Sequence, residues 1–196
     1  MVTVMWRRAL LCLLLLLLAA CSEPTRFYST DITGSTIGTD FSLTDPAGRT
    51  RRLSDFKGKV TIVFFGYTQC PDVCPTTLDA LREAMAALGK QAEQVQVLFI
   101  TLDPERDTAA LLARYVPTFY PTFLGLRGDS ATIAATARAF KVYYKKQPGT
   151  TADSYSIDHA AGSYVYDPQG RLRLYMKYGD APAHIVSDIQ QLLAGK

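Results

Sequence analysis

The sequence predicts an α/β protein with a central sheet flanked by helices, and three observations carry this prediction. Residues 60–65 and 95–102 are continuous apolar runs rich in β-branched side chains, as in strands buried on both faces. Segments with helical periodicity alternate with such runs. Cys70 and Cys74 lie between the first run and the first helical segment. Paired thiols delivered by a strand to the start of a helix indicate a thioredoxin-like layout.

The N-terminal half of the expected domain begins with a hairpin. Residues 41–50 hold two short strand-like stretches around turn chemistry at residues 45–48. Residues 54–58 predict a short loop or a single helical turn before the first buried strand. After the cysteines, apolar residues recur at helical spacing as far as Gly89, which predicts the end of that helix. These apolar residues are Leu78, Leu81, Met85 and Leu88.

The middle of the chain predicts two further helices with a short strand between them. Asp107 or Thr108 is expected to cap a helix after the second buried strand, and Pro117 is expected to end it. Residues 123–126 then predict a short strand, and Asp129 caps the next helix.

The C-terminal part adds strands and a last helix. Residues 142–146 predict a strand, and the turn-rich residues 148–153 leave the sheet, so we expect an inserted β-hairpin excursion. Residues 162–166 and 171–177 flank a turn and predict a second hairpin, which makes the central sheet mixed. The last helix opens near Pro182, and its apolar face contains Ile185, Ile189, Leu192 and Leu193.

The start of the chain resembles a secretory signal. Arg7 and Arg8 precede an apolar run over residues 9–20, which is shorter than the roughly 20 apolar residues that span a bilayer. The run ends in Leu-Ala-Ala-Cys21, which resembles the bacterial lipobox, so we expect Cys21 to be lipidated and to become the mature N-terminus. The alternatives are an uncleaved anchor and an ordinary signal with an incidental cysteine.

This interpretation divides the chain into three parts. Residues 1–20 form the signal, residues 21–39 a flexible lipid-anchored tether, and residues 40–196 a domain that is expected outside the cytoplasm. Once the signal is removed, 19 basic residues face 18 acidic ones. Because no basic run exceeds Lys145 and Lys146, no nucleic-acid partner is expected.

Cysteine use indicates chemistry rather than a structural cross-link. Cys12 leaves with the signal and Cys21 carries lipid, so the domain keeps only Cys70 and Cys74. A disulfide between residues so close in sequence closes a very small loop and removes little entropy from the unfolded chain. In an oxidising compartment, two adjacent thiols serve redox or metal chemistry.

A metal site on this pair needs a third ligand. Residues i and i+4 share one face of a helix, so both sulfurs can point at one ion. The chain has two histidines. His184 falls in the first turn of the last helix, on a face shared with Asp188, which is a solvated surface position. His159 ends residues 155–159, which lead back towards the core, and it is the candidate ligand; its alternative is a hydrogen-bonding loop histidine.

The chemistry of these donors is compatible with two hypotheses, a metal site and a redox pair. Two thiolates and one imidazole form a trigonal set that suits Cu(I), and Cu(II) could bind with an added weak ligand. Structural zinc fits less well, because such sites usually close with four Cys or His ligands. Thiolates at a helix N-terminus are also nucleophiles, so a thiol–disulfide reductase is the alternative.

The cysteine stretch has a family resemblance. Residues 64–75, which read FFGYTQCPDVCP, resemble the signature of the Sco/SenC family of copper-binding proteins. Three further stretches agree in order, namely residues 101–108, 123–126 and 155–159. The likeness runs from about Phe41 to the final helix and covers the whole expected domain.

The resemblance implies a thioredoxin-like fold and a copper site made by Cys70, Cys74 and His159. It also implies a membrane-attached domain outside the cytoplasm that helps build the dinuclear CuA centre of cytochrome c oxidase subunit II. Gln69 stands where many members have His, and Ala160 stands where a hydroxyl residue is common. Neither position is a ligand, so these departures concern fine tuning and partner choice.

Two functions follow from this family. A copper chaperone would pass Cu(I) by ligand exchange to cysteines of subunit II. A reductase would attack a partner disulfide with Cys70 and resolve the mixed disulfide with Cys74. Only the chaperone needs His159 as a ligand. A peroxidase is disfavoured because no residues specify a peroxide pocket.

Further partners are expected from the same resemblance. They are other periplasmic copper chaperones or thiol reductants, and the membrane itself through the lipid anchor. The expected location is the periplasmic face of a bacterial membrane, with the cytoplasmic membrane favoured.

Overall fold

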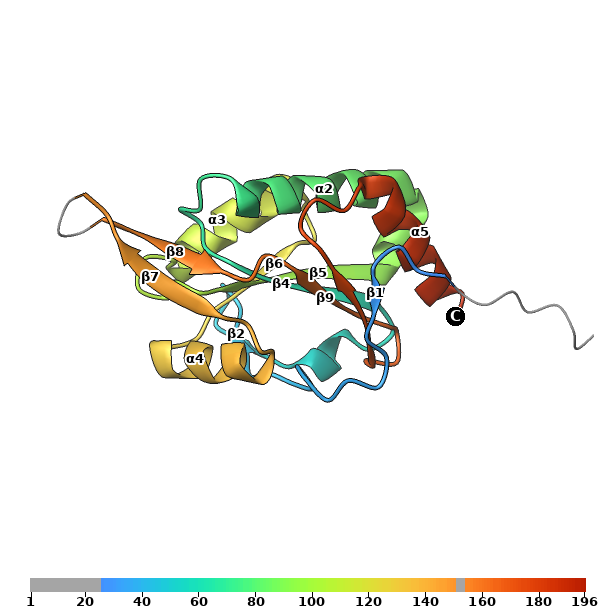
Figure 1. Ribbon diagram of the computed structural model, residues 1–196, viewed down its shortest axis with the longest axis horizontal. Coiled ribbons are helices and arrows are strands. Elements are labelled where there is room, and N and C mark those ends of the chain that lie inside the picture. Colours follow the sequence, from blue (N-terminus) through green and yellow to red (C-terminus); the bar gives the residue numbers. More distant parts are fainter. Residues whose placement is uncertain (1–25, 151–153) are drawn as a thin grey trace, which may run out of the picture.

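A mixed six-stranded sheet forms the centre of the molecule (Figure 1). The computed structural model describes residues 26–150 and 154–196. From one edge to the other, the strands are β1 (Thr30–Asp31), β10 (Leu172–Met176), β9 (Ser163–Tyr166), β4 (Val60–Gly66), β5 (Val95–Thr101) and β6 (Leu124–Leu126). β4, β5 and β6 are parallel, whereas β9 pairs antiparallel with β4. The predicted α/β class and mixed sheet are thereby confirmed.

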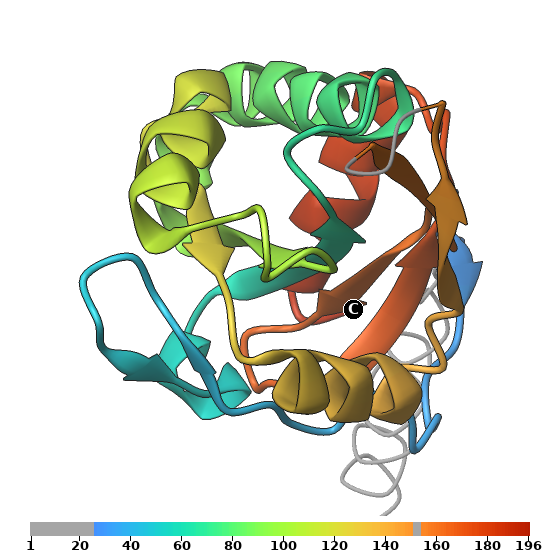
Figure 2. The same cartoon turned by 90° about the vertical axis from the view of Figure 1, so that its left-hand side faces the viewer.

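Helices cover both faces of this sheet (Figure 1 and Figure 2). One face carries α2 (Val73–Leu88), α3 (Ala109–Phe119) and α5 (Pro182–Leu193). The other face carries α4 (Ser130–Ala139), the 3-10 turn η1 (Leu53–Phe56) and the predicted hairpin of β2 (Leu43–Thr44) and β3 (Thr50–Arg51). A second 3-10 segment, η2 (Gly89–Gln94), joins α2 to β5.

The two faces of β4 fill two separate apolar cores. Because side chains alternate along a strand, Ile62 and Phe64 pack with α2 and α5, whereas Val63 and Phe65 pack with α4. Every residue of β4 is buried. This double burial explains why the strand is continuously apolar instead of alternating.

Most predicted helix boundaries are confirmed. Gly89 ends α2 with a φ of 55°. Thr108 caps α3 by accepting a hydrogen bond from the Leu111 N–H at 3.2 Å. Asp129 caps α4 by accepting one from the Thr132 N–H at 2.7 Å.

The end of α3 differs from the prediction. The helix continues past Pro117 to Phe119. Pro117 has no N–H to donate to the carbonyl of Ala113, so one helical hydrogen bond is lost. Because Ala113 is exposed, water can donate a hydrogen bond to that carbonyl instead. Tyr115 and Phe119 also pack edge to face with centroids 5.3 Å apart, which supports the last turn.

The segment before residue 40 belongs to the fold. β1 pairs with β10 in the central sheet. The backbone N–H groups of Tyr28 and Ser29 each donate to the Asp188 carboxylate at 2.8 Å. Further along, the Gly38 N–H donates to the Ala139 carbonyl at 2.9 Å. These contacts hold the segment against the sheet edge, α5 and α4.

Two expectations are corrected by this segment. A flexible tether over residues 21–39 is wrong from Tyr28 onwards, because a buried carboxylate and a strand pairing hold the chain. Asp188, expected on a solvated face, is buried because it accepts those hydrogen bonds. The expected signal, residues 1–20, and Cys21 lie outside the described residues.

A separate two-stranded hairpin projects from one end of the molecule (Figure 1). It contains β7 (Tyr144–Pro148) and β8 (Tyr155–His159), which confirms the inserted β-hairpin excursion. His159 therefore ends a strand rather than a loop. Within residues 26–150 and 154–196, no helix has the length and apolar character needed to cross a membrane.

Candidate metal centre

The two cysteines lie where β4 leads into α2. A short loop after Gly66 carries Cys70, and Cys74 is the second residue of α2. The Cys70 N–H donates to the Tyr67 carbonyl at 3.2 Å, which closes the loop as a turn. The Cys74 N–H donates to the Cys70 sulfur at 3.4 Å. The first turn of the helix thus points an otherwise unpaired backbone donor at this sulfur.

His159 approaches the cysteines from the hairpin. Its Nε2 lies 3.7 Å from the Cys74 Sγ. Its Nδ1 lies 2.9 Å from the Ala160 carbonyl, so we assign Nδ1–H as the donor and leave the Nε2 lone pair towards the sulfur. The ring also contacts Phe64 and Tyr67 edge to face, at centroid distances of 6.3 and 6.1 Å. Together these contacts orient the imidazole as a ligand.

The three side chains form one potential metal-ligating group. The Sγ atoms of Cys70 and Cys74 and a ring nitrogen of His159 all lie within 4.8 Å of one another. In the part of the chain that the structure describes, this is the one cluster of three or more His, Cys, Asp or Glu side chains with such spacing. Two soft sulfurs and one imidazole fit the trigonal coordination of Cu(I).

Burial sets the protonation of this group. Cys74 is fully buried, and the loss of water raises the pKa of its thiol far above the ordinary value. Burial likewise lowers the pKa of His159. Near neutral pH the metal-free site therefore holds a protonated Cys74 and a neutral imidazole. An ion that binds through both must displace the thiol proton.

A close approach between Gly66 and Cys74 forms the floor of the site. A Cβ atom on residue 66 would lie 2.8 Å from the Cys74 Sγ and 2.9 Å from the Phe99 ring. Both distances are too short for real contacts, so a larger residue would displace the sulfur or the ring. Glycine at the end of β4 thus allows α2 to place Cys74 directly against the sheet.

A shallow hollow of about 370 Å³ gives access to the group. Its lining includes Tyr67, Cys70, Pro71, Ile157 and His159. Cys70 is partly exposed whereas Cys74 is buried. An incoming partner therefore meets the Cys70 sulfur first.

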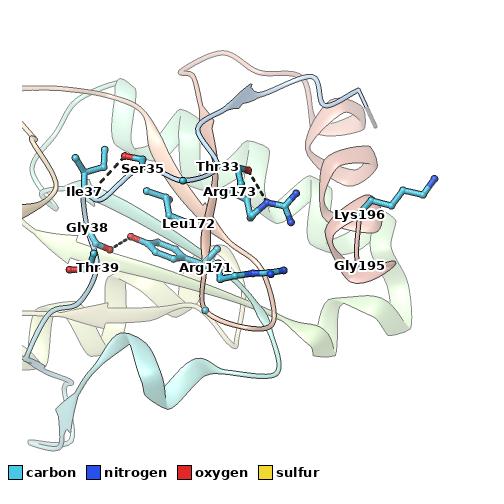
Figure 3. A pocket seen from close by; sticks show the side chains of 13 residues that line it. Thr33, Ser35, Ile37, Gly38, Thr39, Arg171, Leu172, Arg173, Gly195 and Lys196 are labelled. Atoms are coloured by element: carbon cyan, nitrogen blue, oxygen red, sulfur yellow. Dashed lines mark hydrogen bonds between the residues drawn. The ribbon is translucent and has the colours of Figure 1, made fainter. Parts of the chain in front are cut away.

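A larger hollow of about 650 Å³ lies elsewhere, between the N-terminal segment, β10 and the last residues (Figure 3). Its walls are joined by a hydrogen bond of 2.5 Å from Tyr166 Oη to the Gly38 carbonyl, and by one of 2.9 Å from Arg173 Nε to Thr33 Oγ1. None of the described residues that line it is Cys or His. This hollow follows from how the N-terminal segment docks and is separate from the metal-ligating group.

His184 takes no part in the cluster. It is exposed near the start of α5, as predicted, and its ring stacks on Tyr28 at a centroid distance of 4.0 Å. The stack could not be expected from the sequence, because Tyr28 falls in the stretch that reads as a flexible tether.

A buried carboxylate behind the cysteines, Asp107, supports the loop that carries Cys70, whereas its sequence pattern predicts only a helix cap. Asp107 accepts hydrogen bonds from the Thr68 N–H at 3.1 Å, from Thr68 Oγ1 at 2.6 Å and from Thr101 Oγ1 at 2.6 Å. It is fully buried, and burial raises the pKa of its carboxyl group. The available signal was its place beyond the carboxyl end of a buried parallel strand, where site residues of α/β folds gather.

Known proteins resemble this chain in sequence and in structure. The SCO1/SenC family model matches residues 29–194. ScoI of Bradyrhizobium japonicum, solved with copper bound, is 42% identical and has a TM-score of 0.73 over 80% of this chain and 99% of its own. Apo Sco1 of Thermus thermophilus is 40% identical, with a TM-score of 0.76 over 87% of this chain and 99% of its own.

A curated relative gives a shorter match. The SCO2-like protein of Rickettsia felis is 38% identical over 65 residues, which is 33% of this chain and 32% of that protein. The matched part thus spans about a third of that relative's length. The match to the family model covers far more of this chain, since it begins within the docked N-terminal segment and ends just after α5. The thioredoxin-like fold is confirmed, and the chain belongs to the SCO1/SenC family.

Proposed function

We propose that this protein binds a copper ion through Cys70, Cys74 and His159 and carries it as a metallochaperone. The observation that carries the proposal is the approach of the three donor atoms to within 4.8 Å of one another. ScoI of Bradyrhizobium japonicum and yeast Sco1, 42% and 30% identical to this chain, were both solved with copper bound, which supports the choice of metal. The donors suit Cu(I), and Cu(II) with a further weak ligand.

Loading and release of Cu(I) would proceed by ligand exchange without a change of oxidation state. The partly exposed Cys70 receives the ion first, and the buried Cys74 then gives up its proton and becomes the second thiolate ligand. His159 donates the lone pair of its neutral Nε2. In transfer, a thiolate of the partner would add to the ion and the bond to Cys70 would break. The bonds to Cys74 and His159 would break as further ligands of the partner replace them, and Cys74 would regain its proton.

The proposed destination is the CuA centre of cytochrome c oxidase subunit II, on the strength of family membership. Other periplasmic copper chaperones or thiol reductants would load the site or keep its thiols reduced. The protein would be attached through lipidated Cys21 to the periplasmic face of a bacterial membrane, with the cytoplasmic membrane favoured. The lipobox resemblance of the sequence supports this location.

A thiol–disulfide reductase is the second candidate, and the unequal exposure of the two thiols favours it. The Cys70 thiolate would attack a partner disulfide, form a mixed disulfide and release one partner thiol. Cys74 would then attack the Cys70 sulfur and release the second partner thiol. The pair ends as a disulfide, so a separate thiol reductant must restore it. This reaction does not use His159 as a ligand.

An anaerobic Cu(I) competition titration on the reduced protein tests the proposal. His159→Ala is expected to weaken Cu(I) binding about tenfold or more, because the ion loses its third donor. His184→Ala is the matched control and should leave the affinity unchanged, since that ring stacks on Tyr28 away from the cysteines. Tight binding of one copper per chain that depends on His159 supports the chaperone. Weak binding that ignores His159 would reject it in favour of the reductase.

A further inference from the structure

The hairpin that carries His159 is not part of the central sheet. Among residues 26–150 and 154–196, β8 pairs only with β7, from Tyr144 opposite His159 to Pro148 opposite Tyr155. The position of His159 relative to the cysteines therefore depends on contacts between the hairpin, through its backbone and its side chains, and the body of the domain. One such contact is the hydrogen bond of 3.2 Å from the Ile157 N–H to Tyr67 Oη.

A second set of contacts joins the start of β8 to the loop after β5. The guanidinium of Arg106 lies 3.5 Å from the centroid of the Tyr155 ring, and its Nη1 donates to the Tyr155 carbonyl at 3.0 Å. Tyr155 Oη in turn donates to Asp103 Oδ1 at 2.7 Å. Arg106 Nε pairs with the other oxygen of the buried Asp103. A planar cation that stacks and donates at once is a rigid connection.

The same loop also holds the cysteine side of the site. Asp107 binds both the N–H and the hydroxyl of Thr68, which lies two residues before Cys70. The Asp107 N–H donates to the Asp103 carbonyl at 2.8 Å, so the two aspartates belong to one closed turn. Residues 103–107 thus contact the loop that carries Cys70 and the strand that carries His159.

We propose that the turn over residues 103–107 sets the distance between the imidazole and the two sulfurs, with Arg106 and Tyr155 as positioning residues for His159. Neither side chain belongs to the metal-ligating cluster; both act through the hairpin. This inference rests on the proposed function, because the geometry that it fixes is that of the copper ligands. It also gives a role to residues 101–108, a stretch that the sequence resemblance marks without assigning chemistry to it.

Two substitutions test the connection at different strengths. Arg106→Lys keeps the positive charge but removes the planar stack and the paired donors. Tyr155→Phe keeps the ring under the guanidinium and removes only the hydrogen bond to Asp103. Arg82→Lys is the matched control, since Arg82 pairs with Asp79 at the same spacing of three residues, at 2.7 Å, on the exposed side of α2.

The first measurement is Cu(I) affinity of the full-length protein in detergent, with and without His159→Ala. Arg106→Lys is expected to weaken binding about tenfold when His159 is present and to have no effect when it is absent. Tyr155→Phe should weaken it less, and Arg82→Lys not at all. An equal loss in the His159→Ala background would overturn the inference, because the substitution would then act on the thiols or on folding. No loss in either background would overturn it as well.

The second measurement needs no metal. Amide hydrogen exchange of the Ile157 N–H in the metal-free protein reports how firmly β8 is held. Exchange is expected to accelerate in Arg106→Lys and to stay unchanged in Arg82→Lys. If the wild-type protein binds no copper, the proposed function fails while faster exchange still supports the connection. Unchanged exchange in Arg106→Lys would reject the connection, whatever the Cu(I) affinities are.

Discussion

At the scale of single residues, the two thiols of the site differ in their access to water. Cys70 is partly exposed and Cys74 is buried, so the pair is not symmetric. Burial raises the pKa of Cys74 and lowers that of His159. Near neutral pH, copper therefore competes with a proton on Cys74 but with none on His159, which links copper binding to pH.

This link predicts how Cu(I) affinity changes with pH. Because its pKa is raised, Cys74 stays protonated throughout the range from about pH 7 to about pH 8, and each unit of pH raises its deprotonated fraction about tenfold. The apparent Cu(I) affinity should therefore rise at least about tenfold per pH unit across this range. Competition titrations at three pH values measure the slope. A flat profile would show that Cys74 loses no proton on binding.

The close approach at Gly66 gives a second prediction. Gly66→Ala is expected to lower the free energy of unfolding by about 1–3 kcal/mol and to weaken Cu(I) binding, because the added methyl displaces the Cys74 sulfur. Gly125→Ala is the control, since its Cβ would crowd Leu112 at 3.0 Å, away from the cysteines. Urea unfolding should show a loss of stability in both variants, and copper titration a loss of affinity only in the first. Equal affinities would count against the role of Gly66.

At the scale of elements, the docking of the N-terminal segment on Asp188 is expected to contribute strongly to the free energy of unfolding. Asp188→Ala leaves the N–H groups of Tyr28 and Ser29 without their charged acceptor and should lower the free energy of unfolding by about 3 kcal/mol. Amide exchange over β1 should accelerate with it. Asp180→Ala is the control, because Asp180 accepts one exposed N–H, from Lys177, and should cost far less. Similar losses in both variants would contradict the docking role of Asp188.

The same segment shows what the sequence could and could not predict. β4, α2 and the Asp129 cap follow from local patterns of apolar spacing and capping, and all were predicted. The docking of Tyr28 depends on a carboxylate 160 residues away, and its own stretch has little apolar periodicity, so no local pattern could announce it.

The candidate site also has features that the sequence could predict and features that it could not. Its three side chains could be named from cysteine spacing and from the scarcity of histidines. The burial of Cys74 could not, because it results from the packing of α2 against β4. The contacts of Asp103, Arg106 and Asp107 could not be predicted for a related reason. The stretch has the local pattern of a strand end and a helix cap, while its partners Thr68 and Tyr155 come from a distant loop and a distant strand.

At the scale of the whole molecule, attachment to a membrane is the property to test. Cys21→Ser is expected to move the protein from the membrane fraction to the soluble fraction, because a lipidated cysteine is the proposed anchor. Cys12→Ser is the matched control within the signal and should leave the protein in the membrane fraction. Mass spectrometry of the mature N-terminus would identify the lipid. Retention of Cys21→Ser in the membrane would instead indicate an uncleaved anchor.

The docked N-terminal segment also fixes how far an anchored domain could travel. Phe27 packs on the core, and the Arg26 carbonyl accepts a hydrogen bond from Gln191 Nε2 at 3.3 Å. A lipid on Cys21 would therefore be only five residues from the docked chain, a span of at most about 18 Å. β1 and the end of α5 lie towards one end of the long axis, and the β7–β8 hairpin projects from the other (Figure 1). His159 pairs with Tyr144 at the base of that hairpin, where it meets the body of the domain. With the long axis upright, copper would change hands at a height above the lipid set by the distance from β1 to the base of the hairpin. A receiving centre carried on a domain that stands up from the membrane would meet the site at that height, whereas a centre within the membrane plane would require the domain to lie flat on the lipid.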